Sequence, residues 1–263
     1  TVIEKIAGQI VSNVYEKLTL AADGTRTLRE ERKTGANTAL LITEHAYFPD
    51  TAAEPNKGRI QYTRHPDGTL TRYTYANVAD PVTSGQTALK TTVEHGAVDA
   101  AQFAPTATGP VPSLTMGTRT ETVTNSFEKV IEAKSWDIAS DLLIEQAVAT
   151  AVDAVGRPPH IIHDADPDDF ETFTFACCGV KNHRARDGSL TDYTKDALDR
   201  PTLTTVTLSP KTTTTGHTYA TETFNGRTLP KTTVTQTISA GSNSTGSLLV
   251  SETISDMRGH TLI

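Results

Sequence analysis

The residue types best suited to chemistry gather in residues 160–169, with the sequence HIIHDADPDD. Asp164, Asp166 and Asp168 stand at alternate positions and carry oxygen ligands of the kind that calcium prefers. An EF-hand would also need a glycine inside the loop and a closing glutamate further along, and this segment supplies neither. Aspartate and proline are equally favoured in turns for backbone reasons. We therefore expect a hairpin turn at residues 166–168, with a weak calcium site at the three aspartates as the alternative.

Histidine and cysteine spacing gives no further support to a metal site. His160 and His163 are three residues apart, which suits zinc binding from one helix face, but this segment has the pattern of a strand and a turn. Cys177 and Cys178 are neighbours and would point to opposite faces of a strand. One such pair builds neither a disulfide framework nor a zinc site. We predict no metal-binding residues.

Motifs for enzymatic chemistry are absent from the sequence. It contains no Gly-x-Ser-x-Gly elbow and no glycine-rich phosphate loop. We predict no catalytic residues, no cofactor and no enzyme. Four tyrosines could stack on sugar rings if exposed, although at strand alternation they would pack on a sheet: Tyr62, Tyr73, Tyr75 and Tyr193. Trp136 is expected to be a packing anchor, and Asn243-Ser244-Thr245 fits the glycosylation triplet.

The composition favours strands and argues against two kinds of partner. Threonine occurs 47 times in 263 residues, and its branched side chain suits a pleated, half-buried surface. A glycosylated stalk would also be rich in threonine, but it would lack the interleaved apolar residues seen here. The net charge of -7, with scattered Lys and Arg, predicts no nucleic-acid binding. No apolar run reaches the roughly 18–20 residues that span a bilayer, so we expect no membrane span.

An internal repeat is the most informative feature of the chain. Residues 67–75 (DGTLTRYTY) align without a gap with residues 187–195 (DGSLTDYTK). A second element occurs at residues 153–158 (DAVGRP) and 196–201 (DALDRP). Residues 176–179 (ACCG) lie between these two copies in the same frame, which gives a local period of about 21–22 residues.

One repeat unit is expected to be two short strands joined by a tight turn. The Asp-Gly pair suits a two-residue type I′ turn. In the strand that follows, Tyr73 and Tyr75 are two residues apart and share one face, with Thr74 on the other. A single hairpin is marginally stable in water, so each unit must stack on its neighbours. The predicted fold is therefore all-β, with stacked β-hairpin repeats forming a spiralling, solenoid-like sheet that is part of a shell.

Residues 127–150 fit two secondary structures. Two runs, 128–134 and 142–148, contain good helix formers. Residues 138–141 can equally form a turn between strands at 130–136 and 142–150, since both arms alternate. The repeat frame favours the strands.

Four segments follow from these patterns. Residues 1–97 carry the first repeats, and residues 98–117 form a loop with three prolines that is inserted between repeats. Residues 118–239 hold the clearest repeats. Residues 240–263 are a loop followed by the start of a further, degenerate repeat. The chain begins without methionine and ends in a strand-like pattern, so we expect it to be an internal piece of a longer protein.

The combination of Asp-Gly-x4-Tyr-x-Tyr with Asp-Ala-x-Gly-Arg-Pro resembles the YD repeat of RHS proteins, which include bacterial polymorphic toxins, toxin-complex shells and teneurins. The resemblance is clear over residues 58–80 and 153–205. It departs from the family pattern at Asp199, which replaces glycine, and at Lys195, which replaces the second aromatic residue.

The resemblance implies a structural segment in the wall of a β-shell, secreted or at the cell surface, that in some members encloses a C-terminal toxin. Its partners would be neighbouring repeats of the same longer chain and an encapsulated toxin or cell-surface glycan. The family's self-cleaving core has no counterpart that can be assigned to residues here. Two other functions stay open: a carbohydrate- or surface-binding β-repeat module, and an unrecognised enzyme of β-helix type.

Overall fold

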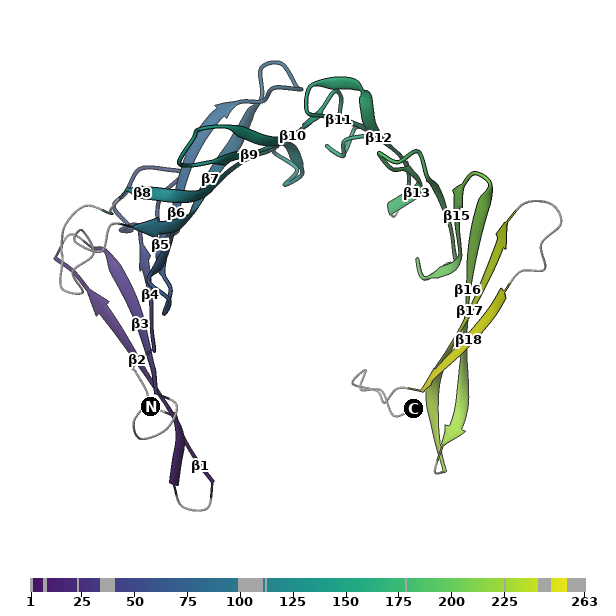
Figure 1. Ribbon diagram of the computed structural model, residues 1–263, viewed down its shortest axis with the longest axis horizontal. Helices are drawn as coiled ribbons and strands as arrows, with labels where there is room; N and C mark the ends of the chain where they lie inside the picture. Colours follow the sequence, from purple (N-terminus) through teal and green to yellow (C-terminus); the bar gives the residue numbers. More distant parts are fainter. Residues whose placement is uncertain are drawn as a thin grey trace. The chain divides into compact units, whose positions relative to one another are not determined.

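The computed structural model of the chain describes residues 2–6, 9–22, 24–33, 41–98, 111, 113–177, 179–224, 226–240 and 247–254 (Figure 1). All regular secondary structure in these residues is β strand, and they contain no helix. The expectation of an all-β chain is therefore confirmed. The strands divide between two compact units, which are described separately: Thr1–Pro158 with His163–Ala165, and Pro159–Ile162 with Asp166–Ile263.

The first unit is an antiparallel meander in which each strand pairs with the next one along the chain. The longest pairing joins the central strands β6 and β7, with Thr69 opposite Ala97 and Ala79 opposite Thr87. Its strands are β1 (Val2–Ile6), β2 (Gln9–Leu20), β3 (Arg26–Lys33), β4 (Leu41–Tyr47), β5 (Ile60–Arg64), β6 (Thr69–Ala79), β7 (Thr87–Val98), β8 (Leu114–Thr124), β9 (Val130–Asp137) and β10 (Leu143–Ala149).

The second unit is a meander of the same kind, with antiparallel pairing from β12 to β18. Its longest hairpin, β16 with β17, is rich in paired threonines such as Thr214 opposite Thr237 and Thr218 opposite Thr233. The short strand β11 (His160–His163) contributes residues to both units. The other strands are β12 (Asp166–Ala176), β13 (Gly179–Arg184), β14 (Leu190–Lys195), β15 (Pro201–Leu208), β16 (Lys211–Phe224), β17 (Arg227–Ala240) and β18 (Ser247–Ile254).

Within the described part of the chain, one turn geometry occurs six times, and both units contain copies of it. In each copy the fourth residue donates its N–H to the carbonyl of the first at 2.9–3.0 Å, and the first donates to the carbonyl of the fifth at 2.9 Å. The fourth residue has a positive φ, between 60° and 86°. The copies occupy residues 21–24, 65–68, 125–128, 153–156, 185–188 and 196–199.

This geometry corrects the predicted turn type. In the loop that precedes β6, Gly68 has a φ of 86° while Pro66 and Asp67 are not in the left-handed region. The loop is a type I turn followed by one left-handed residue, which is the three-residue hairpin connection, and not a two-residue type I′ turn. Pro66 explains the choice, because its fixed φ suits the second position of a type I turn.

The predicted turn at residues 166–168 is also wrong in position. Asp164 and Ala165 have φ values of 49° and 59°, so these two residues make the turn, and β12 already begins at Asp166. Pro167 cannot adopt the positive φ that this turn needs. Asp164 can, because aspartate tolerates the left-handed region better than most residues.

The ambiguous residues 127–150 are strands, as the repeat frame indicated. Strands β9 and β10 pair antiparallel, with Leu143 opposite Trp136 and Val148 opposite Glu132. The N–H of Asp137 donates to the carbonyl of Leu142 at 2.9 Å and closes the turn between them. The loop expected at residues 98–117 overlaps the end of β7 and the start of β8, and residues 99–110 and 112 lie outside the described residues.

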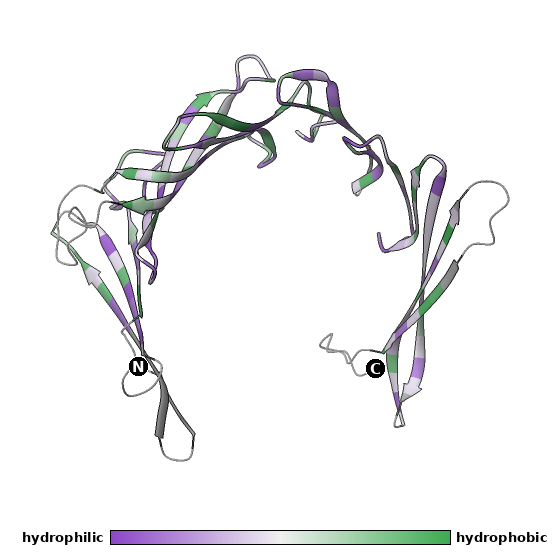
Figure 2. Cartoon of the chain, in the orientation of Figure 1, coloured by the Kyte–Doolittle hydropathy of each residue, from purple (hydrophilic) through white to green (hydrophobic). Residues whose placement is uncertain are grey.

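The apolar core of the first unit is small. Ala88, Val123, Ile131 and Ala149 form its buried cluster, with Val78, Val82 and Val152 packed against it. Many larger apolar side chains are exposed instead, among them Leu18, Leu20, Leu142 and Ile144. Figure 2 shows apolar residues interspersed with polar ones along the strands. Backbone pairing between neighbouring strands therefore provides much of the order that side-chain burial provides in a two-layer domain.

Candidate functional site

Two of the aspartates in residues 160–169 accept hydrogen bonds from backbone N–H groups. Asp164 Oδ1 accepts the N–H of Gln146 at 2.9 Å, and Asp166 Oδ1 accepts the N–H of Asp168 at 2.9 Å. The His160 ring lies 5.2 Å from the ring of Phe170, and His163 is buried. Within the described residues, no group of three His, Cys, Asp or Glu side chains is arranged to hold a metal ion.

Two of the four tyrosines proposed for sugar stacking, Tyr62 and Tyr75, pack within the sheet. Tyr62 donates its hydroxyl to Glu44 Oε1 at 3.0 Å, and burial, followed by the nearby Glu44 charge, raises the pKa of Tyr62. Tyr75 lies 6.4 Å from the ring of Phe48 and 5.0 Å from the guanidinium of Arg59. Burial also raises the pKa of Tyr75. These contacts occupy the ring faces and edges that a sugar would need.

A groove of about 460 Å³ opens on the second unit beside β13 and β14. Tyr193 and Lys195 line it, and the ammonium of Lys195 lies 2.9 Å from Asp199 Oδ1. Cys177 is exposed at the groove, while Cys178 and the triplet at Asn243 lie outside the described residues. The lining therefore combines one aromatic ring with a charge pair that is already neutralised.

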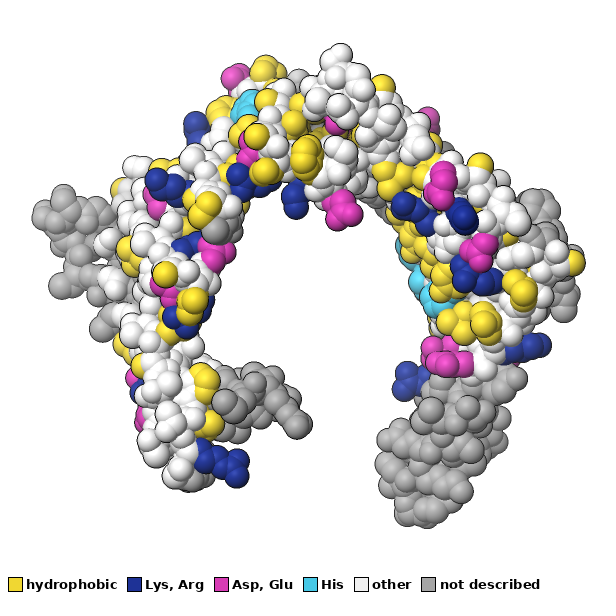
Figure 3. Space-filling model, turned by 180° about the vertical axis from the view of Figure 1, so that it is seen from behind, with side chains coloured by type: hydrophobic (Ala, Val, Ile, Leu, Met, Phe, Trp, Pro, Cys, Tyr) yellow, Lys and Arg dark blue, Asp and Glu magenta, His cyan; other side chains and the backbone are white. Residues whose placement is uncertain are grey.

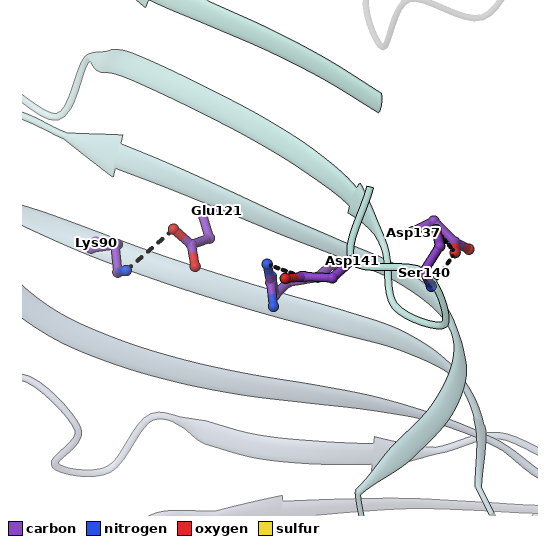
Figure 4. A network of polar contacts seen from close by, with 6 residues as sticks. Lys90, Glu121, Asp137, Ser140 and Asp141 are labelled. Atoms are coloured by element: carbon purple, nitrogen blue, oxygen red, sulfur yellow. Dashed lines mark hydrogen bonds and ion pairs between the residues drawn. The ribbon is translucent and has the colours of Figure 1, made fainter. Parts of the chain in front are cut away.

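Cross-strand ion pairs form the main polar contacts of the first unit (Figure 4). Lys90 Nζ on β7 lies 3.2 Å from Glu121 Oε2 on β8. Arg72 on β6 pairs with Glu94 on β7. Side chains of opposite charge on adjacent strands stabilise one register over its neighbours.

Arg119 extends the row from Arg72 and Glu94 to the next two strands. Arg72, Glu94, Arg119 and Trp136 stand opposite one another on β6, β7, β8 and β9. The Arg119 guanidinium lies 4.7 Å above the centre of the Trp136 ring and 2.8 Å from Asp141 Oδ1. Trp136 is thus a packing anchor, as expected, and its partner is a cation.

Turn carboxylates form a second recurring set of polar contacts. Asp67 accepts the N–H and hydroxyl of Thr69 at 2.9 and 2.7 Å, and these bonds lower the pKa of Asp67. Hydrogen bonds from the hydroxyl and N–H of Ser189 lower the pKa of Asp187 in the equivalent turn.

A variant of the turn places the carboxylate at the first position and an arginine at the fifth. Asp196 accepts the N–H groups of Leu198 and Arg200 and the Nε–H of Arg200. The side chain of Arg200, ahead of the backbone N–H groups, lowers the pKa of Asp196. Asp153 and Arg157 repeat the arrangement in the first unit, with 2.7 Å between Arg157 Nε and Asp153 Oδ2.

Sequence reasoning identified the turns but missed the ion pairs and the arginine–tryptophan stack. The members of these ion pairs are 22 or more residues apart in sequence, and Arg119 is 17 residues from Trp136, so only the strand register brings them together. On the face drawn in Figure 3, basic and acidic side chains lie beside one another, without a large patch of either sign.

Comparison with known proteins identifies no relative: no protein-family model and no curated protein matches the chain. In the described part of the chain, there is no helix with the length and apolar character that crossing a membrane requires. The contacts described above join neighbouring strands or close turns, and their common effect is to hold strand register.

Proposed function

We propose that the chain is a structural segment of a large secreted or cell-surface protein of the YD/RHS type. It would form part of the wall of a spiralling β-shell whose interior holds a C-terminal effector, and would itself carry out no catalysis. The observation that carries this proposal is the recurrence of one turn geometry, six times, in a meander of antiparallel strands.

Both sequence elements of the repeat form this same turn. Residues 65–68 and 185–188 contain the Asp-Gly element, whereas 153–156 and 196–199 contain the Asp-Ala element. All four have the same backbone hydrogen bonds, with the carboxylate at the third position in one element and at the first position in the other. A repeat protein is expected to preserve backbone geometry in this way while its side chains diverge.

The small core supports the same interpretation. A meander with few fully buried apolar residues gains stability by pairing with further strands and by covering its exposed leucines. Neighbouring repeats of a longer chain would supply both kinds of contact.

Sedimentation velocity of the isolated 263-residue chain tests the structural role. Exposed sheet edges are expected to make it self-associate as its concentration rises. A compact monomer that unfolds in one cooperative transition would contradict the proposal.

A glycan array tests the alternative role in carbohydrate binding. We expect no binding by the wild-type chain, since the rings of Tyr62 and Tyr75 are engaged within the sheet. Binding that is lost in the variants Tyr73→Ala and Tyr75→Ala would establish the alternative instead.

A further inference from the structure

Three consecutive strands of the first unit, β4 to β6, have counterparts in β12 to β14 of the second unit. The turn at residues 65–68 corresponds to the turn at residues 185–188. Both sets pair antiparallel in the same register, which shifts at the same place, next to Tyr47 in one set and next to Phe175 in the other. Residues around these turns therefore correspond one to one.

Large side chains pack together at one end of the first set. Phe48 directly follows β4, and its N–H donates to the carbonyl of Arg59 at 2.8 Å. The rings of Phe48 and Tyr75 meet edge to face with their centres 6.4 Å apart, and the Arg59 guanidinium lies 5.0 Å from the centre of the Tyr75 ring. Two aromatic rings and a guanidinium thus fill this place in the first unit.

A groove opens at the corresponding place in the second unit. Small or flexible residues stand there instead of large ones: Ala176 for Phe48, Gly179 for Arg59 and Lys195 for Tyr75. All three line the groove of about 460 Å³. A Cβ on Gly179 would lie 2.9 Å from Lys195 Nζ, so the glycine leaves room for the ammonium. The groove therefore exists because a ring and a guanidinium are missing.

One lysine gives the groove a surplus positive charge. The Lys195 ammonium is neutralised by Asp199, and the Asp196 carboxylate accepts from Arg200 Nε at 2.8 Å. Lys181 on β13 also lines the groove, is exposed, and has no carboxylate partner among the described residues. An unpaired ammonium at the wall of a groove favours an anionic ligand.

The remaining wall suits a flat apolar group. Tyr193 is half-buried at the groove, and no ring contact within the described residues occupies its faces. Val180 and Ala197 add apolar surface beside it. A ligand ring in this space would also adjoin the Lys195 ammonium, and cations are attracted to the faces of aromatic rings. The volume lies within the range of about 300–1,000 Å³ that small-molecule sites usually have.

We propose that this groove binds a small aromatic carboxylate. The ligand ring occupies the space that Phe48 and Arg59 fill in the first unit, and the carboxylate pairs with Lys181. A ligand of about a dozen non-hydrogen atoms should have a dissociation constant of about 1 mM, given the binding energy per atom that is typical of small ligands.

Saturation-transfer NMR of 2-naphthoate with the whole chain tests the site and does not require the chain to be a monomer. The wild type should show saturable binding at about 1 mM. Ala176→Phe restores the ring that the first unit has at this place, so it should weaken binding about tenfold or more by filling the groove. Unchanged binding by Ala176→Phe would overturn the proposal.

The charge is tested separately, with Lys181→Gln and with 2-naphthamide, which has the same shape but no charge. Lys181→Gln should weaken the binding of 2-naphthoate about two- to fivefold, the size of an exposed ion pair, and should leave the binding of 2-naphthamide unchanged. Lys211→Gln removes an exposed lysine of β16 that does not line the groove, and this matched control should bind as the wild type does. No saturable binding by the wild type, or the same affinity in the two lysine variants, would overturn the proposal whether or not Ala176→Phe folds.

Discussion

At the scale of single residues, the turn at residues 153–156 is packed more tightly than the other copies. Asn125 Nδ2 donates to the carbonyl of Gly156 at 2.8 Å, so this turn is joined to the turn at residues 125–128. A Cβ added to Gly156 would lie 2.5–2.7 Å from atoms of Phe127. Gly156 is therefore constrained by its φ of 76° and by its neighbour as well.

Gly156→Ala should accordingly destabilise the first unit more than Gly68→Ala. Gly68 also has a positive φ, but an added Cβ would meet nothing within 4 Å, so only the left-handed strain of about 1–2 kcal/mol applies. Gly156→Ala adds overpacking of about 1–3 kcal/mol. Urea denaturation measures both free energies of unfolding. Phe127→Ala should reduce the extra cost of Gly156→Ala in a double-mutant cycle, and equal costs for the two glycine variants would contradict the packing argument.

The turn carboxylates predict a loss of stability in acid. The pKa of Asp187 is lowered in the folded chain by the hydroxyl and N–H of Ser189. Its stabilising effect is therefore complete above the unfolded pKa, near 3.9, and is lost as pH falls through the lower folded pKa. Asp187→Asn keeps an acceptor oxygen but cannot titrate, so its unfolding midpoint should vary less below about pH 4 than that of the wild type. An unchanged pH dependence would show that the turn carboxylate contributes nothing.

At the scale of elements, strand positions followed from the sequence better than turn geometry did. Alternation around residues 130–136 and 142–150, together with the repeat frame, identified β9 and β10. The Asp-Gly pair identified the hairpin before β6 but is compatible with two turn types, and Pro66 was the signal that distinguishes them. In the turn before β12, Ala165 has a positive φ that its residue type does not predict, since alanine seldom adopts such a φ.

Strands β8 and β9 are joined by a contact that the single tryptophan can report. Arg119→Ala removes the stack on Trp136 and the ion pair with Asp141. Asp141→Asn removes the ion pair alone, because asparagine tolerates the positive φ of residue 141. Because Asp141 is largely exposed, its variant should cost little. Arg119→Ala should cost about 0.5–1 kcal/mol more.

Urea denaturation followed by Trp136 emission measures both variants, since the chain has one tryptophan. A red shift in the native emission of Arg119→Ala, absent in Asp141→Asn, is also expected, because Arg119→Ala removes the stack on Trp136. Equal stability of the two variants would show that the ion pair, and not the stack on Trp136, stabilises this part of the sheet.

At the scale of the whole molecule, composition and repeat period predicted an all-β chain but could not predict the ion pairs or the stack of Arg119 on Trp136. Both depend on which residues stand opposite one another, and register is set by turn length and bulges as well as by sequence pattern. The bulge between Val123 and Thr124, opposite Glu132 and Val130, is one such shift. The ends of the expected insertion loop, residues 98–117, belong to β7 and β8.

Electron cryomicroscopy of the proposed shell protein tests the central proposal most directly. We predict that β1 to β18 continue into flanking strands of the same kind and form part of the wall around an enclosed space, with the six turns at regular positions along the wall. A map in which these residues form a separate domain, with no strands continuing from it into neighbouring repeats, would contradict the proposed structural role.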